Sequence, residues 1–166
     1  MRRMQGLEMT LPSGMPPGFL DRIAADIADR TTLFDRHGEL LVLDEAGAVP
    51  EMVSLLARRD VATSSVPLLL LPETGLRPGA DYADYAFETP AGHAYLDLHL
   101  AALFRLTNEE PIAEPAPALL QLEEHLLLSV DEPGGTVWHA IDRQLTELAE
   151  RIARVYGCRV AWLEAD

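Results

Sequence analysis

Two different periods of hydrophobic residues occur in this chain, and this mixture constrains the fold more than any other sequence feature. Between residues 17 and 30, apolar side chains recur at the spacing of one helical face. Between residues 93 and 100, apolar and polar side chains alternate, as in a half-buried strand. A chain that contains both patterns, separated by Pro- and Gly-rich turns, is predicted to be an α+β protein.

The other segments complete a prediction of a single-layer, mostly antiparallel sheet packed by two or three helices. Helices are expected over residues 17–30, 50–59 and 136–156. Strands are expected over residues 31–35, 39–44, 68–71, 84–89, 93–100 and 158–163. Two alternatives stay open: residues 90–106 have a rival interpretation as a helix, and residues 119–130 fit either a strand or a buried helix.

The domain organisation follows from length and turn composition. Residues 1–16 are rich in Met, Pro and Gly and lack periodicity, so they are expected to form a loose lead-in. Residues 17–166 are expected to fold as one α+β domain, because a chain of this length buries a sizeable core without disulfides. The proline-rich residues 107–117 mark a place where two subdomains could divide. The single cysteine, Cys158, is expected to be a buried core residue, and no internal repeat is found.

The C-terminal part of the chain combines an apolar run, a tight turn, a long helix and a closing strand. Thr136 is expected to cap the start of this helix, and Gly157 stands where a left-handed cap ends it. This C-terminal β-α-β unit resembles one half of a ferredoxin-like sandwich. With the turn at residues 131–134, it also resembles small ligand-binding regulatory domains, which makes ligand sensing one functional hypothesis. A single short turn does not assign the chain to a family.

Charge excludes several functions. All 13 basic residues are arginines, and the formal net charge is −14. Without lysine, Schiff-base chemistry and a Walker-type phosphate site are excluded. An acidic surface repels nucleic acid and anionic membranes and favours encounters with a protein that has a basic surface. No membrane span or secretion signal is recognised, so the protein is expected to be cytoplasmic. No cofactor is expected, and self-association is left open.

Negative charge is concentrated between Arg105 and Arg143, a stretch without any arginine or lysine. The predicted binding surface lies in its first half and consists of five glutamates: Glu109, Glu110, Glu114, Glu123 and Glu124. The first functional hypothesis is therefore a non-enzymatic acidic accessory protein. Such an adaptor, chaperone or immunity-type binder would dock onto a basic region of a partner protein.

A small metal-dependent enzyme is the alternative hypothesis. Asp97 and His99 would project from one strand face with Cα atoms about 7 Å apart, and His125 would supply a third ligand. No dense zinc, nucleotide or serine-hydrolase motif accompanies them, so no catalytic residue is assigned. His139 and Asp142 lie about one turn apart in the predicted helix, close enough for the carboxylate to bond the imidazole. The role expected for His139 is nevertheless packing or capping.

Overall fold

The structure is a computed structural model that describes residues 1–28, 33–44, 48–108 and 111–163. These residues form four α-helices and two antiparallel sheets, one of them a half-barrel of six curled strands, so the predicted α+β class is confirmed. The predicted single-layer sheet is wrong, because the strands divide between two sheets. The chain divides into two compact units, Met1–Leu70 with Glu88–Tyr95, and Leu71–Phe87 with Leu96–Asp166.

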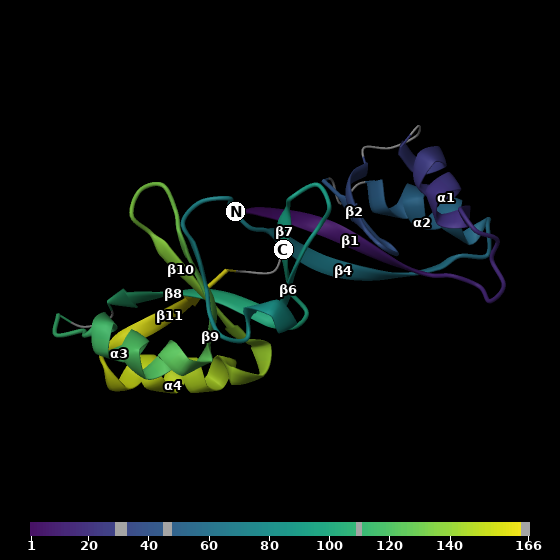
Figure 1. The fold of residues 1–166 in the computed structure, drawn as a ribbon. Helices are drawn as coiled ribbons and strands as arrows, with labels where there is room; N and C mark the ends of the chain where they lie inside the picture. The colour runs from purple at the N-terminus through teal and green to yellow at the C-terminus, as the bar shows by residue number, and fades with distance from the viewer. Residues whose placement is uncertain (29–32, 45–47, 109–110, 164–166) are drawn as a thin grey trace. The chain divides into compact units, whose positions relative to one another are not determined.

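The first unit is built from a strand–helix–strand–strand–helix–strand sequence of elements. These are β1 (Arg2–Thr10), α1 (Phe19–Ala28), β2 (Leu33–His37), β3 (Leu40–Leu43), α2 (Val49–Ala57) and β4 (Ala62–Leu70). The strands lie in the order β2-β3-β1-β4 and their pairings are antiparallel. The two helices lie side by side over one sheet face (Figure 1), where they enclose a core that includes Leu7, Ile23, Leu41 and Met52.

The second unit repeats the same succession of elements. These are β8 (Ala101–Asn108), α3 (Pro115–Leu122), β9 (Leu126–Asp131), β10 (Val137–Asp142), α4 (Thr146–Val155) and β11 (Cys158–Trp162). The strands lie in the order β11-β8-β10-β9, again with antiparallel pairings. Helices α3 and α4 lie side by side (Figure 1) and share a core with Phe104 and Ile141.

Both units therefore have the βαββαβ topology of a ferredoxin-like sandwich. In each, the first strand lies between the third and the fourth, and the second strand pairs with the third. The sequence shows no repeat because this topology requires apolar residues and turns at suitable spacings, and many different side chains satisfy that requirement.

The segment between β4 and β8 adds strands to both sheets. Strand β5 (Leu76–Pro78) pairs with β9 in the second sheet. After the 3₁₀ turn η2 (Tyr82–Asp84), β6 (Ala86–Glu88) and β7 (Ala94–Asp97) extend the first sheet beside β4. The predicted hairpin at this place is confirmed, although its second strand is shorter than residues 93–100. The rival helix over residues 90–106 is wrong.

Residues 2–10, expected to belong to a loose lead-in, instead form β1 in the middle of the first sheet. Leu7 and Met9 pack in the core beneath the helices, and Met4 and Gly6 are also buried. A strand that is buried on both faces does not alternate between polar and apolar residues. This is why the search for periodicity missed it.

The helix predicted over residues 136–156 is half wrong, since residues 137–142 form β10 and only residues 146–155 are α-helical. Val137 and Ile141 are four residues apart, a spacing that puts two side chains on one face of a helix and also on one face of a strand. Thr136 caps no helix, because the turn before it joins β9 to β10. Gly157 follows α4 with φ of +65°, as predicted.

Other predicted elements agree with the structure. Helices α1 and α2 and the hairpin β2–β3 lie where they were expected, with residues 29–32 outside the described residues. Residues 119–130 contain both alternatives, the end of α3 and strand β9, joined by η3 (Glu123–His125). Residues 107–117 lie within the second unit and include the ends of β8 and α3. None of the helices in the described part of the chain is long and apolar enough to cross a membrane.

Candidate functional site

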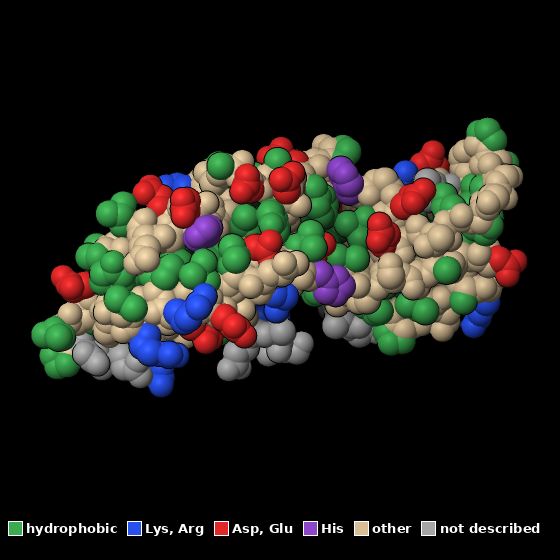
Figure 2. All heavy atoms as spheres, turned by 90° about the horizontal axis from the view of Figure 1, so that it is seen from below, with side chains coloured by type: hydrophobic (Ala, Val, Ile, Leu, Met, Phe, Trp, Pro, Cys, Tyr) green, Lys and Arg blue, Asp and Glu red, His purple; other side chains and the backbone are tan. Residues whose placement is uncertain are grey.

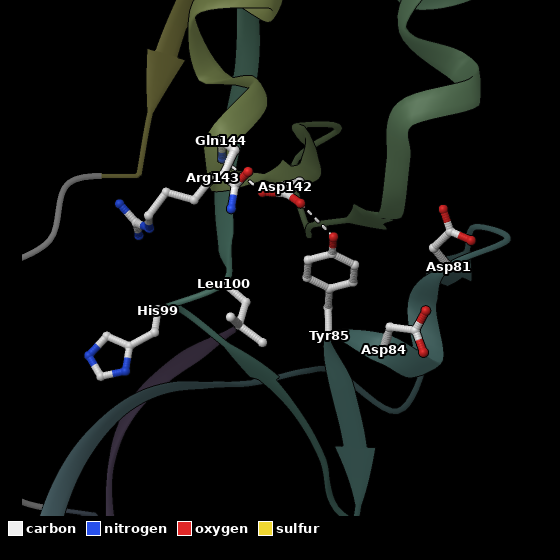
Figure 3. Close-up of a pocket in the computed structure, with 8 residues that line it drawn as sticks. All are labelled: Asp81, Asp84, Tyr85, His99, Leu100, Asp142, Arg143 and Gln144. Carbon is white, nitrogen blue, oxygen red and sulfur yellow. Dashed lines mark hydrogen bonds between the residues drawn. The ribbon is translucent and has the colours of Figure 1, made fainter.

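A polar groove of about 600 Å³ lies in the second unit (Figure 3). Its lining comes from η2, from the turn after β7 and from the end of β10 with the following 3₁₀ turn η4 (Arg143–Leu145). The lining residues are Asp81, Asp84, Tyr85, His99, Leu100, Asp142, Arg143 and Gln144. Three carboxylates thus face one hollow.

Asp142 connects two of the segments that line the groove. One carboxylate oxygen, Oδ2, accepts a hydrogen bond from Tyr85 Oη at 2.6 Å, and Oδ1 accepts one from the backbone N–H of Gln144 at 2.8 Å. These bonds lower the pKa of Asp142. The bond to Asp142 also raises the pKa of Tyr85 to about 12. At neutral pH the carboxylate is therefore charged, and the phenol is a neutral hydrogen-bond donor.

The guanidinium group of Arg143 is engaged by the backbone. Nε and Nη2 donate to the carbonyl oxygen of Leu98 at 3.1 and 2.6 Å, and Nη2 also donates to that of Ala101 at 3.2 Å. Figure 3 shows the Arg143 side chain pointing away from Tyr85 and Asp84. Arg143 therefore holds in place the turn that carries His99. All three hydrogen bonds go to backbone carbonyls and none of them to a carboxylate of the groove.

Three of the five glutamates predicted as a binding surface lie at the two ends of α3. Glu114 immediately precedes this helix, Glu123 and Glu124 follow it in η3, and all three side chains are exposed. Glu109 and Glu110 lie outside the described residues. The sequence analysis thus identified these three exposed glutamates. It did not single out Asp81 and Asp84, and it placed Asp142 beside His139 in a predicted helix.

The residues of the metal hypothesis lie in separate surroundings. Asp97 Oδ1 accepts a hydrogen bond from the backbone N–H of His99 at 2.7 Å, so this pair forms a local turn. His125 lies in η3, with Nε2 at 3.5 Å from a carboxylate oxygen of Glu124. Within the described residues, no three His, Cys, Asp or Glu side chains are grouped so that they could hold a metal ion. The metal site stays a prediction.

His93 is paired with Asp35, a carboxylate that the sequence analysis did not single out. Asp35 Oδ2 accepts hydrogen bonds from Thr89 Oγ1 at 2.6 Å and Tyr95 Oη at 3.0 Å, and it lies 2.7 Å from His93 Nδ1. Oδ1 accepts the backbone N–H of Arg36 at 2.7 Å. Burial acts to raise the pKa of Asp35, but these hydrogen bonds outweigh it and the pKa is lowered.

The contacts of Asp35 join strands that lie at opposite edges of the first sheet. Asp35 belongs to the edge strand β2, whereas Thr89, His93 and Tyr95 belong to the β6–β7 hairpin, which ends at the other edge. The sheet is curled, so these bonds close its open side. The ring of His93 also stacks on Phe34, with 5.1 Å between centroids. We interpret this cluster as a structural closure.

His139 and Asp142 do not bond each other, because both lie on β10 and residues three apart on a strand point to opposite faces. Asp142 binds Tyr85, and His139 Nδ1 lies 2.8 Å from Oγ of its cross-strand neighbour Ser129. Burial lowers the pKa of His139, so its imidazole is neutral at pH 7. Cys158 is buried as predicted, and burial raises the pKa of its thiol.

Protein-family models, curated proteins and solved structures were all compared with the chain, and none of them matches it. The groove is therefore interpreted from its own chemistry. Its volume is in the range of small-molecule sites, but those sites are lined mainly by apolar side chains. A lining with three carboxylates favours a cationic group over an apolar ligand.

Proposed function

We propose that the protein is a non-enzymatic acidic accessory protein, an adaptor, chaperone or immunity-type binder that docks onto a basic region of a partner protein. The observation that carries this proposal is the groove, which Asp81, Asp84 and Asp142 line while Arg143 is bound to backbone carbonyls. An arginine or lysine side chain of the partner would enter the groove and form charge-assisted hydrogen bonds with these carboxylates.

The charge of the whole chain supports the same proposal. The formal net charge is −14. Asp and Glu side chains are spread over much of the face drawn in Figure 2, with Arg side chains at fewer places. Such a field accelerates encounters with a basic protein and suppresses encounters with acidic ones. We expect it to act mainly on the rate of association.

The protonation states in the groove favour binding over catalysis. A general base works best when its pKa lies near the operating pH. Asp142 has a lowered pKa because Tyr85 and Gln144 donate to it, and Tyr85 has a pKa of about 12. Neither group is suited to proton transfer at neutral pH, whereas the charged carboxylate of Asp142 is suited to holding a cation in place.

Replacing Asp81 and Asp84 together by asparagine is expected to weaken the binding of a basic peptide. Both carboxylates are exposed, so D81N/D84N should fold normally. Two surface charges in direct contact with a cation are worth about tenfold in affinity. The probe is a synthetic peptide of alternating lysine and serine, titrated calorimetrically into the full chain at low salt.

The matched control is E8Q/E51Q, which removes the same charge from two exposed positions in the first unit. Its affinity for the peptide is expected to stay within about twofold of wild type, because neither carboxylate lines the groove and so neither contacts the bound cation directly. Equal losses in the two double variants would mean that the peptide senses only the net charge. No binding by wild type at low salt would end the proposal altogether.

A further inference from the structure

Helix α3 has a buried side and an exposed side of different chemistry. Ala118 and Leu122 are fully buried, in the core shared with Ile152 of α4. The side away from this core carries Leu120, whose exposed fraction is 70%. A leucine at this position contributes nothing to the core and leaves most of its apolar surface in water.

Two further apolar side chains are exposed in the same helical layer. Ile112, just before α3, is 80% exposed, and Val155, the last residue of α4, is 78% exposed. The backbone N–H of Glu114 donates to the carbonyl of Tyr156 at 2.9 Å, which brings the start of α3 beside the end of α4. Ile112 and Val155 therefore lie at one end of the layer, and Leu120 lies farther along α3.

Carboxylates stand at both ends of this surface. Glu114 precedes α3, and Glu123 and Glu124 follow Leu120 by three and four residues. All three are exposed, and the whole stretch from Arg105 to Arg143 contains no arginine or lysine between these two arginines. Val155 is left out of this group, because Arg151 and Arg154 on α4 are exposed within one helical turn of it. We name the surface formed by Ile112, Glu114, Leu120, Glu123 and Glu124 the α3 face.

We infer that the α3 face is a docking surface for a cationic amphipathic segment of a partner protein, one that carries large apolar side chains between lysines or arginines. This inference rests on the proposed function and adds the partner's apolar side chains to it. Charge complementarity selects this occupant, because a second copy of the chain would bring the same carboxylates against Glu123 and Glu124.

The two kinds of side chain have different tasks in this interface. Burying Leu120 and Ile112 against apolar residues of the partner supplies affinity, since each large aliphatic side chain removed from water is worth about tenfold or more. The carboxylates at the ends orient the segment and raise its association rate. A segment that is only basic would therefore bind more weakly than one that is basic and apolar.

Two peptides of equal length and lysine content test this inference on the full chain. One has leucine at every third or fourth position, so that leucines share one helical face, and the other has serine at those positions. The leucine peptide is expected to bind wild type at least about tenfold more tightly than the serine peptide in calorimetric titrations. The double variant I112S/L120S should lose most of this advantage.

The control V53S/E51Q changes an exposed valine and a glutamate on α2 and should keep the full advantage. Equal affinity of the two peptides for wild type, or an advantage that survives in I112S/L120S, would overturn the α3 face as the docking surface. In that case, the proposed function would still hold if the serine peptide binds wild type and binds D81N/D84N more weakly. If neither peptide binds, both proposals fail.

Dimerisation of wild type that I112S/L120S abolishes would also overturn the inference, because a second copy would cover the face.

Discussion

Asp35→Ala is expected to lower the free energy of unfolding by about 3–5 kcal/mol, the range seen when one partner of a buried charged network is removed. The variant leaves Thr89, His93 and Tyr95 without the carboxylate that they share. A buried polar group that loses its partner costs about 1–3 kcal/mol. The measurement is urea unfolding followed by circular dichroism.

Single donors provide the control for this experiment. Thr89→Val and Tyr95→Phe each remove one hydrogen bond to Asp35 and leave the other bonds to Asp35 intact. Thr89→Val also removes a long bond of 3.5 Å to the carbonyl of His93. Each is expected to cost about 1 kcal/mol. If Asp35→Ala costs no more than either of them, the cluster does not close the curled sheet.

The pH dependence gives a second readout of the same carboxylate. Its pKa is lower in the folded protein, so ionised Asp35 stabilises the fold above the unfolded pKa of about 3.9. This contribution is lost as the pH falls through the folded pKa. The stability difference between wild type and Asp35→Asn is therefore expected to shrink steadily below a pH of about 4. A difference that grows toward low pH would contradict the assignment.

Gly79→Ala is expected to cost about 3 kcal/mol or more and to disrupt the polar groove. A Cβ at this position would lie 2.0 Å from the backbone oxygen of Leu126. The N–H of Gly79 also donates to the carbonyl of Leu127 at 2.8 Å, so two backbones run in direct contact. Because a backbone oxygen cannot rotate away, β5 must move from β9, and η2 with Tyr85 must follow.

The groove supplies the spectroscopic readout for this variant. In wild type, Tyr85 is expected to titrate near its pKa of about 12, because it donates to Asp142. In Gly79→Ala the ultraviolet titration should show this phenol near about 10, the value of a free tyrosine. Gly14→Ala is the control for backbone strain without a clash: φ of +82° strains an alanine there by about 1–2 kcal/mol, but an added Cβ has no neighbour within 4 Å. A Gly79→Ala protein as stable as Gly14→Ala, with its Tyr85 titration unchanged, would refute the steric argument.

Local signals in the sequence were sufficient for several elements. Ile23 and Ile27 mark the buried side of α1, and Gly38, with φ of +57°, turns the β2–β3 hairpin. Gly157 ends α4 in the same way. These elements could be predicted because each depends on residues that are close in sequence.

Long-range pairing could not be predicted from the same signals. Strand β1 pairs with β4 across about sixty positions, from Arg2 with Leu70 to Thr10 with Ala62, and nothing local in either strand encodes this register. The spacing of Val137 and Ile141 fits a strand as well as a helix, so β10 was missed. The repeated topology became visible only when the pairings of both sheets were known.

The same contrast between local signals and long-range contacts applies to the candidate site. The exposed glutamates around α3 could be predicted, since charged residues near prolines in a short segment usually face water. Asp35 could not, because its hydroxyl partner Thr89 lies 54 positions away. The bond between Tyr85 and Asp142 likewise spans 57 positions.

Docking through negative charge is the claim on which the proposed function depends, and the salt dependence of peptide affinity measures it most directly. The wild-type chain is titrated with the lysine–serine peptide over a series of sodium chloride concentrations. Affinity is expected to fall by about tenfold or more between about 50 and 500 mM salt, because screening weakens contacts between exposed charges. An affinity that is the same at both ends of the series would contradict the claim.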